Sequence, residues 1–93
     1  MDVQTTIKRT KQFEKELQKV PDFIQKKFIL WVFLVESQGL KEVRKHKGYH
    51  DEPLNGKRKG QRSIRLSKGY RAIYREVSKT IEILMMEINK HDY

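Results

Sequence analysis

The fold is decided by a stretch in the C-terminal half of the chain, residues 62–77, which reads RSIRLSKGYRAIYREV. Residues 62–66 alternate between polar and apolar side chains, which is typical of a strand with one buried face. Residues 67–69, Ser-Lys-Gly, predict a turn, and residues 70–77 alternate again. Two strands joined by so short a turn predict an antiparallel hairpin.

Alternation also assigns side chains of the second strand to faces, and it groups Ala72 with Tyr74, and Arg71 with Ile73 and Arg75. Ser78 and Lys79 predict another turn. Residues 80–88, TIEILMMEI, form a largely apolar run, which predicts a third strand in a central position of the sheet.

Upstream of the hairpin, the sequence predicts one short strand and two helices. Residues 3–7, VQTTI, are β-branched and alternate, as in a strand. Thr10 is suited to cap a helix over residues 10–19, and a second helix over residues 21–37 should stop at Gly39. The order β-α-α-β-β-β predicts an α+β domain in which two helices cover an antiparallel sheet.

The second helix is apolar on more than one face. One stripe at helical spacing consists of Ile24, Phe28, Trp31 and Val35. The apolar residues that point elsewhere are Phe23, Ile29, Leu30, Phe33 and Leu34. Burial in the core is the favoured interpretation of this helix, and a partner-binding face is the alternative.

Length and composition indicate one small domain. The chain has 93 residues, 37% of them hydrophobic, and no Cys, so a disulfide scaffold, a thiolate zinc site and a cysteine nucleophile are excluded. No signal-peptide pattern opens the sequence, and the longest apolar run, residues 28–35, is far shorter than the ~20 residues that span a bilayer. We therefore expect a single domain over residues 1–93, located in the cytoplasm and without a membrane partner.

The positive charge is concentrated in the middle of the chain. The net charge is +9, and residues 41–75 alone hold 12 basic and three acidic residues. A localised positive field attracts polyanions such as nucleic acid. A solvated basic surface without a partner is the alternative interpretation.

No standard catalytic motif occurs: the sequence has no phosphate-binding glycine loop, no HExxH and no GxSxG. A metal site from His50, Asp51, Glu52 and His91 is conceivable, but their spacing is not that of a known site, so we expect no metal and no cofactor.

Arginine and tyrosine side chains instead indicate a site for RNA, because guanidinium groups hold phosphates and aromatic rings stack on unpaired bases. The expected RNA-binding cations of the basic region are Lys57, Arg58, Lys59, Arg62 and Lys68. The tyrosines that could stack on bases are Tyr49, Tyr70, Tyr74 and Tyr93.

Residues 48–74 read GYHDEPLNGKRKGQRSIRLSKGYRAIY, and in this segment the sequence resembles the bacterial toxins of the RelE/ParE superfamily. The basic segment GKRKGQRSIRL resembles HigB-type toxins, GYRAIY resembles the corresponding strand of RelE, and residues 52–54, EPL, resemble YoeB. The closing residues NKHDY resemble the His- and Tyr-bearing ends of these toxins. The resemblance covers residues 49–93, while the helical half matches in size and order only. It implies a RelE-like microbial-RNase fold.

The resemblance also implies an activity. Members of the family cleave mRNA in the ribosomal A site by transesterification, in which the ribose 2′-OH attacks the adjacent phosphorus and the 5′-oxygen leaves. The implied roles are Arg71 as the phosphate-stabilising cation, Glu52 as base, His91 as acid, Tyr93 as a residue that stacks on a base or shapes the site, and Arg65 and Lys90 as supporting cations. Ser63 and Arg65 stand where RelE has strand lysines, which shifts the role of base to Glu52.

Structural alternatives exist for the two central residues. Arg71 could form an ion pair with Glu82 or Glu87 on the next strand, and Glu52 could form a salt bridge with the basic loop, residues 56–60 (GKRKG).

The function implied is a toxin of a type II toxin–antitoxin system, an endoribonuclease whose partners are a cognate antitoxin, mRNA and the 70S ribosome in a bacterial cytoplasm. One alternative is a ParE-like inhibitor of DNA gyrase with the same fold. A second alternative is a non-enzymatic nucleic-acid-binding module.

Overall fold

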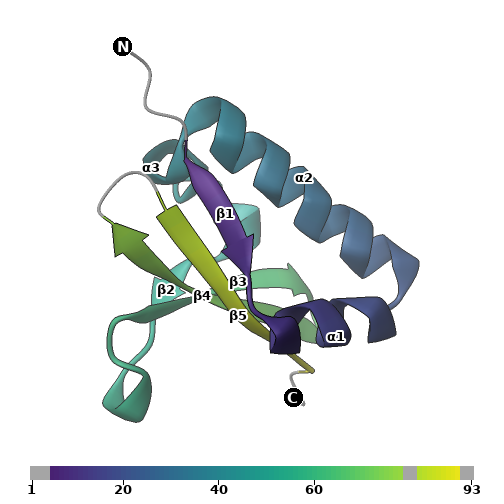
Figure 1. The fold of residues 1–93 in the computed structure, drawn as a ribbon. Coiled ribbons are helices and arrows are strands. Elements are labelled where there is room, and N and C mark those ends of the chain that lie inside the picture. The colour runs from purple at the N-terminus through teal and green to yellow at the C-terminus, as the bar shows by residue number, and fades with distance from the viewer. Residues whose placement is uncertain (1–4, 79–81, 91–93) are drawn as a thin grey trace.

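The structure is a computed structural model, and it describes residues 5–78 and 82–90. Its elements in chain order are β1 (Thr6–Arg9), α1 (Lys11–Lys19), α2 (Asp22–Gln38), α3 (Leu40–Val43), β2 (Glu52–Pro53), β3 (Gln61–Ser67), β4 (Tyr70–Ser78) and β5 (Glu82–Lys90) (Figure 1). Two short 3-10 helices, η1 (Lys47–Tyr49) and η2 (Gly56–Arg58), lie in the connection between α3 and β3. The α+β class predicted from the sequence is confirmed.

The five strands form one sheet in the order β1-β5-β4-β3-β2. Strands β2 to β5 pair antiparallel, as predicted, whereas β1 pairs parallel with β5. The prediction of a purely antiparallel sheet is therefore wrong for this edge. The chain passes through helices α1 to α3 and strands β2 to β4 before it reaches β5, and a connection of this length lets β1 and β5 run in the same direction. Residues 3 and 4 of the predicted first strand, residues 3–7, lie outside the described residues, and in the described part β1 spans Thr6–Arg9.

Local capping explains where the helices begin and end. The Thr10 hydroxyl accepts a hydrogen bond from the backbone N–H of Phe13 at 3.0 Å, so it caps α1 as predicted. Gly39 ends α2 with φ 90°, and its N–H donates to the Val35 carbonyl at 2.8 Å. A left-handed backbone is one that glycine adopts without steric cost, which fits its position after the helix.

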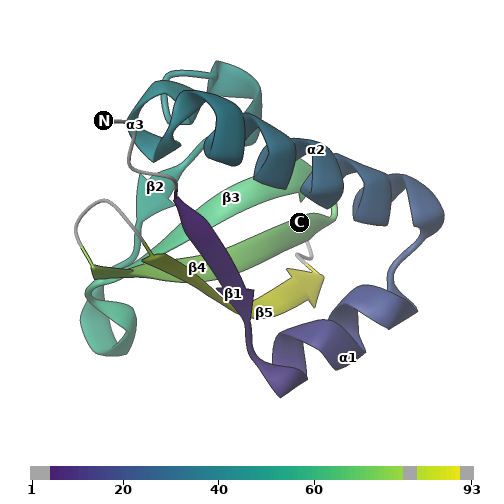
Figure 2. The same cartoon turned by 45° about the horizontal axis from the view of Figure 1, so that its top comes forward.

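The core lies between the helices and one face of the sheet (Figure 2). The predicted stripe of α2 is buried there, and it packs with Phe13, Ile64, Ala72, Tyr74 and Met85. Residues on the opposite side of α2 are exposed, among them Phe23 and Phe33 at 63% each. The structure therefore confirms burial of one stripe and leaves a second apolar stripe of α2 facing solvent. No helix in the described part of the chain has the length and apolar character needed to cross a membrane.

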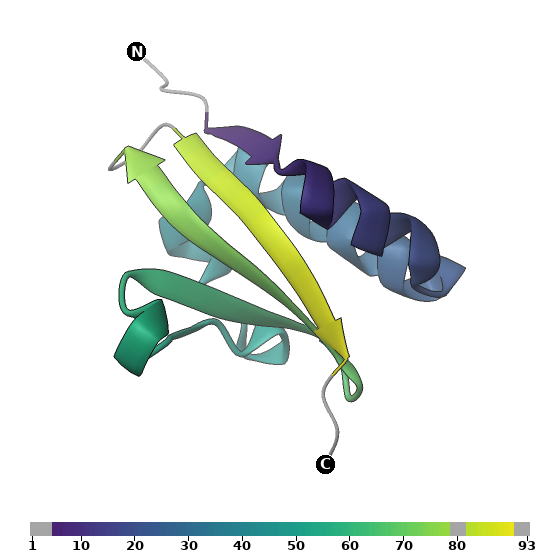
Figure 3. The same ribbon diagram turned by 60° about the horizontal axis from the view of Figure 1, so that its bottom comes forward.

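The other face of the sheet is left uncovered by α1 and α2 (Figure 3). Strand alternation directs Ser63 and Arg65 of β3, and Arg71, Ile73 and Arg75 of β4, to this side. We call this side the open face. Because the middle of the chain carries most of the positive charge, the open face is where the basic strands present their side chains.

Candidate active site

Arg71 lies near the centre of the open face, on β4. Its Nη1 donates to the Ser63 hydroxyl at 2.7 Å and to Glu52 Oε1 at 3.0 Å. Ser63 lies on β3 directly opposite Glu52 of β2, so the guanidinium reaches across two neighbouring strands. The Arg71 side chain is 17% exposed and Ser63 is buried. Two partners therefore hold the guanidinium in a fixed position, while its Nε and Nη2 donors are not used in these two bonds.

Glu52 uses its second carboxylate oxygen for His50. Oε2 lies 3.3 Å from His50 Nε2, and the two side chains are 45% and 58% exposed. His50 has φ 45° and ψ 51°, a left-handed conformation that non-glycine residues adopt rarely. The result is a continuous polar chain that runs from His50 through Glu52 and Arg71 to Ser63, from solvent to the sheet.

A row of arginines follows β3 and β4 on the open face. Arg65 lies directly opposite Arg71 in the antiparallel register, and Arg75 lies opposite Gln61 further along β4. Like charges opposite each other across strands repel, and a bound anion between them removes that repulsion. The arrangement is suited to hold phosphate groups.

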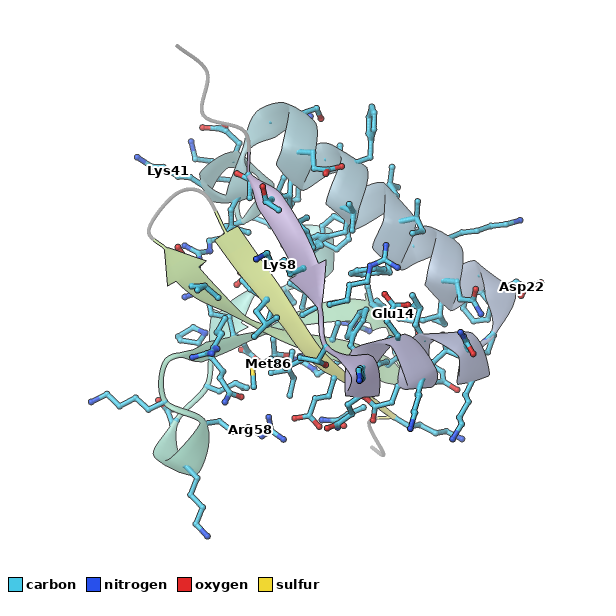
Figure 4. All side chains as sticks on the ribbon, viewed as in Figure 1. Lys8, Glu14, Asp22, Lys41, Arg58 and Met86 are labelled. Atoms are coloured by element: carbon cyan, nitrogen blue, oxygen red, sulfur yellow. The ribbon has the colours of Figure 1, made fainter. Side chains whose placement is uncertain are left out.

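The basic loop folds over the open face through Arg58. Its guanidinium contacts Glu87 of β5 and donates to Gln61 Oε1 at 2.9 Å. Figure 4 shows the Arg58 side chain extending from η2 toward the strands. Lys57 and Lys59 on either side of it are exposed. Because Glu87 is engaged by Arg58 and Arg71 by Glu52, the alternative ion pair between Arg71 and Glu87 does not form.

The remaining predicted cations lie at the other end of the sheet. Lys68 is exposed in the turn between β3 and β4, and Lys90 is exposed at the end of β5, where it pairs with Tyr70. The predicted acid His91 and the predicted Tyr93 lie outside the described residues. Exposed lysines are therefore present at both ends of the sheet: Lys57 and Lys59 at one end, and Lys68 and Lys90 at the other.

Arg62 faces the helical side instead and holds a buried carboxylate. Asp51, whose side chain is 1% exposed, accepts from Arg62 Nε at 2.6 Å and from the Tyr74 hydroxyl at 2.5 Å. Arg44, at the end of α3, lies 3.9 Å from the same carboxylate and also contacts Glu76. Burial lowers the pKa of Arg44, but hydrogen bonds to Glu76 and Tyr74 outweigh it and raise the pKa overall. This cluster anchors the segment directly before Glu52.

Two of the tyrosines predicted to stack on bases are not accessible. Tyr74 is fully buried, with its ring centroid 5.4 Å from that of Trp31, and Tyr49 is also buried. Burial raises the pKa of both phenols, and for Tyr74 the nearby Asp51 carboxylate raises it further. The stacking prediction is wrong for these two residues because a tyrosine ring packs in a core as readily as on a base when its hydroxyl has a partner.

Three further residues belong to the site by position: His50, Ser63 and Arg75. Alternation along β4 placed Arg75 on the same face as Arg71, so Arg75 could have been predicted as a site residue from the sequence. Ser63 could not be identified, because its partner Arg71 comes from another strand, whereas His50 lies only two residues before its partner Glu52 and gave no sign of this role. Among the described residues, no group of three or more His, Asp or Glu side chains is placed to hold a metal ion.

No protein-family profile and no curated protein sequence matches this chain. Solved structures do match it over nearly its whole length. A chain of the E. coli DinJ–YafQ toxin–antitoxin complex has a TM-score of 0.70 and 21% identity, covering 96% of this chain and 94% of that one. The archaeal RelE–RelB complex from Pyrococcus horikoshii has a TM-score of 0.73 and 24% identity, covering 95% and 96%. A YoeB/ParE toxin from Agrobacterium tumefaciens has a TM-score of 0.73 and 16% identity, covering 95% and 100%.

These three structures share the arrangement described above at identities that establish the fold alone. The open face with Arg71 and Glu52 is thus built on a known architecture. The chain has the fold of the RelE/ParE toxin superfamily.

Proposed function

We propose that this chain is the toxin of a type II toxin–antitoxin system, a single toxin domain over residues 1–93 that cleaves mRNA at the ribosome. The observation that carries the proposal is the Arg71–Glu52 pair, 3.0 Å apart on a strongly basic open face. A fixed cation beside a carboxylate offers the two charges that phosphodiester cleavage needs, one for the phosphate and one for a proton.

Arg71 is the cation that stabilises the phosphate. As the 2′-OH attacks, negative charge grows on the phosphorus oxygens, and a guanidinium already held by Ser63 and Glu52 needs no reorganisation to receive it. Arg65, directly opposite, supports the same charge. Preorganised cations of this kind contribute more at a partly buried site than in water.

Proton transfer is assigned to the groups around Arg71. Glu52 is on the base side of the reaction, close to where the 2′-OH must lie if the phosphate is bound by Arg71. His91 is the proposed acid for the leaving 5′-oxygen, since imidazole changes its charge near neutral pH. Tyr93 stacks on a base or shapes the site. The cations proposed to bind the RNA backbone are Lys57, Arg58, Lys59, Lys68 and Lys90.

Arg62 has a smaller part in this proposal than the sequence suggested. Its Nε is bound to the buried Asp51, so it supports the position of Glu52 from behind. Its contribution to RNA binding is limited to the donors that this bond leaves unused.

The proposed partners are a cognate antitoxin, mRNA and the 70S ribosome in a bacterial cytoplasm. Similar folds occur in a complex named as a toxin–antitoxin complex and in a RelE–RelB complex, which supports an antitoxin as partner. An acidic antitoxin segment would be attracted to the basic open face. The exposed stripe of α2, with Phe23 and Phe33, is a second candidate contact.

The test is induced expression in a bacterium, with mRNA ends mapped by primer extension. We expect growth arrest with cuts inside codons for the natural chain, and loss of both for Arg71→Ala and His91→Ala. Lys26→Ala is the control, because it removes a positive charge from the exposed side of α2, away from Arg71, and it should retain arrest. Thermal unfolding of each purified variant confirms that the fold is kept.

Growth arrest with intact messages would contradict the ribonuclease and favour a ParE-like action on DNA gyrase, the alternative that the similarity to a YoeB/ParE toxin keeps open. RNA binding without arrest or cleavage would instead indicate a non-enzymatic binding module.

A further inference from the structure

We infer that His50 is the group that receives the proton of the 2′-OH, and that Glu52 acts through it as a positioning residue. The inference rests on the proposed ribonuclease function and refines the base side of that site. The structure places His50 Nε2 3.3 Å from Glu52 Oε2, while Glu52 Oε1 is bound to Arg71. With one oxygen at Arg71 and the other at His50, Glu52 serves the base side of the reaction by orienting the imidazole and stabilising its positive charge.

Exposure separates the roles of the three residues. His50 is 58% exposed, Glu52 45%, and Arg71 17%. An RNA strand that approaches the open face from solvent therefore meets the imidazole first. A base must come within hydrogen-bond reach of the hydroxyl that it deprotonates, and the more exposed group satisfies this condition more easily.

The backbone around His50 is held from both sides. Its N–H donates to the Lys47 carbonyl at 3.1 Å, and the side chain of the next residue, Asp51, is buried and bound by Arg62 and Tyr74. Within the described ranges, His50 is the single non-glycine residue with positive φ. Histidine, like asparagine and aspartate, is enriched among the non-glycine residues in this conformation, so the turn accommodates it. Strained positions of this kind concentrate at functional sites.

The chemistry follows from the contact of His50 Nε2 with Glu52 Oε2 at 3.3 Å. When the proton of the ring is on Nε2 and faces the carboxylate, the lone pair that accepts a proton is on Nδ1. Nδ1 takes the proton of the 2′-OH, O2′ forms a bond to phosphorus, and the bond between phosphorus and O5′ breaks. O5′ leaves with a proton from the acid of the site, which gives a 2′,3′-cyclic phosphate and a 5′-hydroxyl. Glu52 stabilises the imidazolium that forms, as the carboxylate does in other histidine–carboxylate pairs.

The test compares cleavage of a defined mRNA on 70S ribosomes by the purified natural chain and by His50→Gly. Glycine accepts the left-handed backbone, so this variant should keep the fold, which thermal unfolding verifies. Loss of a general base lowers the rate by about 100-fold or more. Added imidazole should restore part of the His50→Gly rate, which a merely structural role of His50 would not allow. His46→Ala, a change at another exposed histidine, should cleave within about twofold of the natural chain.

The outcomes separate this inference from the proposed function. If the natural chain cleaves and His50→Gly cleaves equally well, His50 is not the base, while the ribonuclease stands. If His50→Gly is slow but imidazole restores nothing and His50→Gln is fully active, the ring only supports the structure and the inference is wrong. If the natural chain itself cleaves no RNA on ribosomes, the proposed function fails and this inference fails with it.

Discussion

Tyr74 connects the hydrophobic core to a buried charge. Its ring packs on Trp31, and its hydroxyl donates to Asp51 at 2.5 Å. Burial, followed by the negative charge of Asp51, raises the pKa of Tyr74 well above its ordinary value of 10.0, although the hydrogen bond from Arg44 opposes this. The folded protein therefore keeps this phenol protonated at pH values where a free tyrosine ionises.

This shift predicts a loss of stability in alkaline solution. The unfolded chain ionises Tyr74 near pH 10, roughly the value of a free tyrosine, while the folded chain does not. The stabilisation is thus complete below about pH 10 and decreases as the pH rises toward the raised pKa of the folded state. Tyr74→Phe should lower the free energy of unfolding at neutral pH by about 1–3 kcal/mol, because Asp51 loses a partner. Urea unfolding at a series of pH values should show a shallower alkaline decline for the variant.

Tyr70→Phe is the matched control, because Tyr70 is only partly buried, and this variant should keep the alkaline decline of the natural chain. Identical pH profiles for Tyr74→Phe and the natural chain would mean that the Tyr74 hydroxyl is not the group responsible.

The contrast between Tyr74 and Arg71 shows what single residues reveal from sequence. Alternation correctly placed Tyr74 with Ala72 on one face, and both are buried. It could not tell that this face is the core, since a tyrosine suits either a core or a base-stacking surface. The roles of Arg71 and Glu52 were predicted from a family resemblance and not from their spacing. Their contact joins two strands that only the tertiary structure brings together.

At the scale of elements, local signals predicted most of the boundaries. Thr10 and Gly39 mark helix ends because capping depends on neighbouring residues alone. Strand β2, at Glu52–Pro53, has only two residues and so carries no periodicity to detect. The direction of β1 depends on its partner β5, more than 70 residues later, and local sequence does not encode it.

The pairing of β3 with β4 places two arginines opposite each other. We expect this pair to lower the stability of the fold while it strengthens RNA binding. Arg65 and Arg71 are directly opposite in the register, an arrangement that destabilises a strand pair. Arg65→Gln should therefore raise the free energy of unfolding by about 0.5 kcal/mol while weakening RNA binding. The gain should shrink at about 1 M salt, where charge repulsion is screened within roughly 3 Å. Urea unfolding at low and high salt measures both effects.

Arg75→Gln provides the comparison for this prediction, since Arg75 lies opposite the uncharged Gln61 and its replacement should leave stability nearly unchanged. A lower stability of Arg65→Gln would show that the arginine pair does not repel in the folded protein.

At the scale of the whole molecule, positive charge is concentrated on one side. The open face carries the arginine row, and η2 adds Lys57 and Lys59 beside it. The solvent side of α2 carries Asp22, Lys26 and Glu36, where basic and acidic residues nearly balance. A molecule with a net charge of +9 therefore directs its positive field mainly from one side, and this favours a defined orientation toward a polyanion.

Because the positive charge is concentrated on one side, the salt dependence of RNA affinity can show which lysines contact the RNA. Each phosphate contact to a single strand contributes about −0.7 to the slope of log affinity against log salt. The double variant Lys57→Gln, Lys59→Gln should therefore reduce the magnitude of that slope by about 1.4. The matched control, Lys26→Gln with Lys41→Gln, removes the same charge from α2 and α3; Figure 4 shows Lys41 at the opposite end of the molecule from Arg58.

Fluorescence anisotropy with a labelled single-stranded RNA, between about 50 and 200 mM salt, gives the slopes. The control should lower affinity slightly and leave the slope unchanged, because its lysines lie away from the RNA. Equal reductions in both double variants would mean that RNA binds the general positive charge of the molecule, and the open face would lose its place as the binding surface.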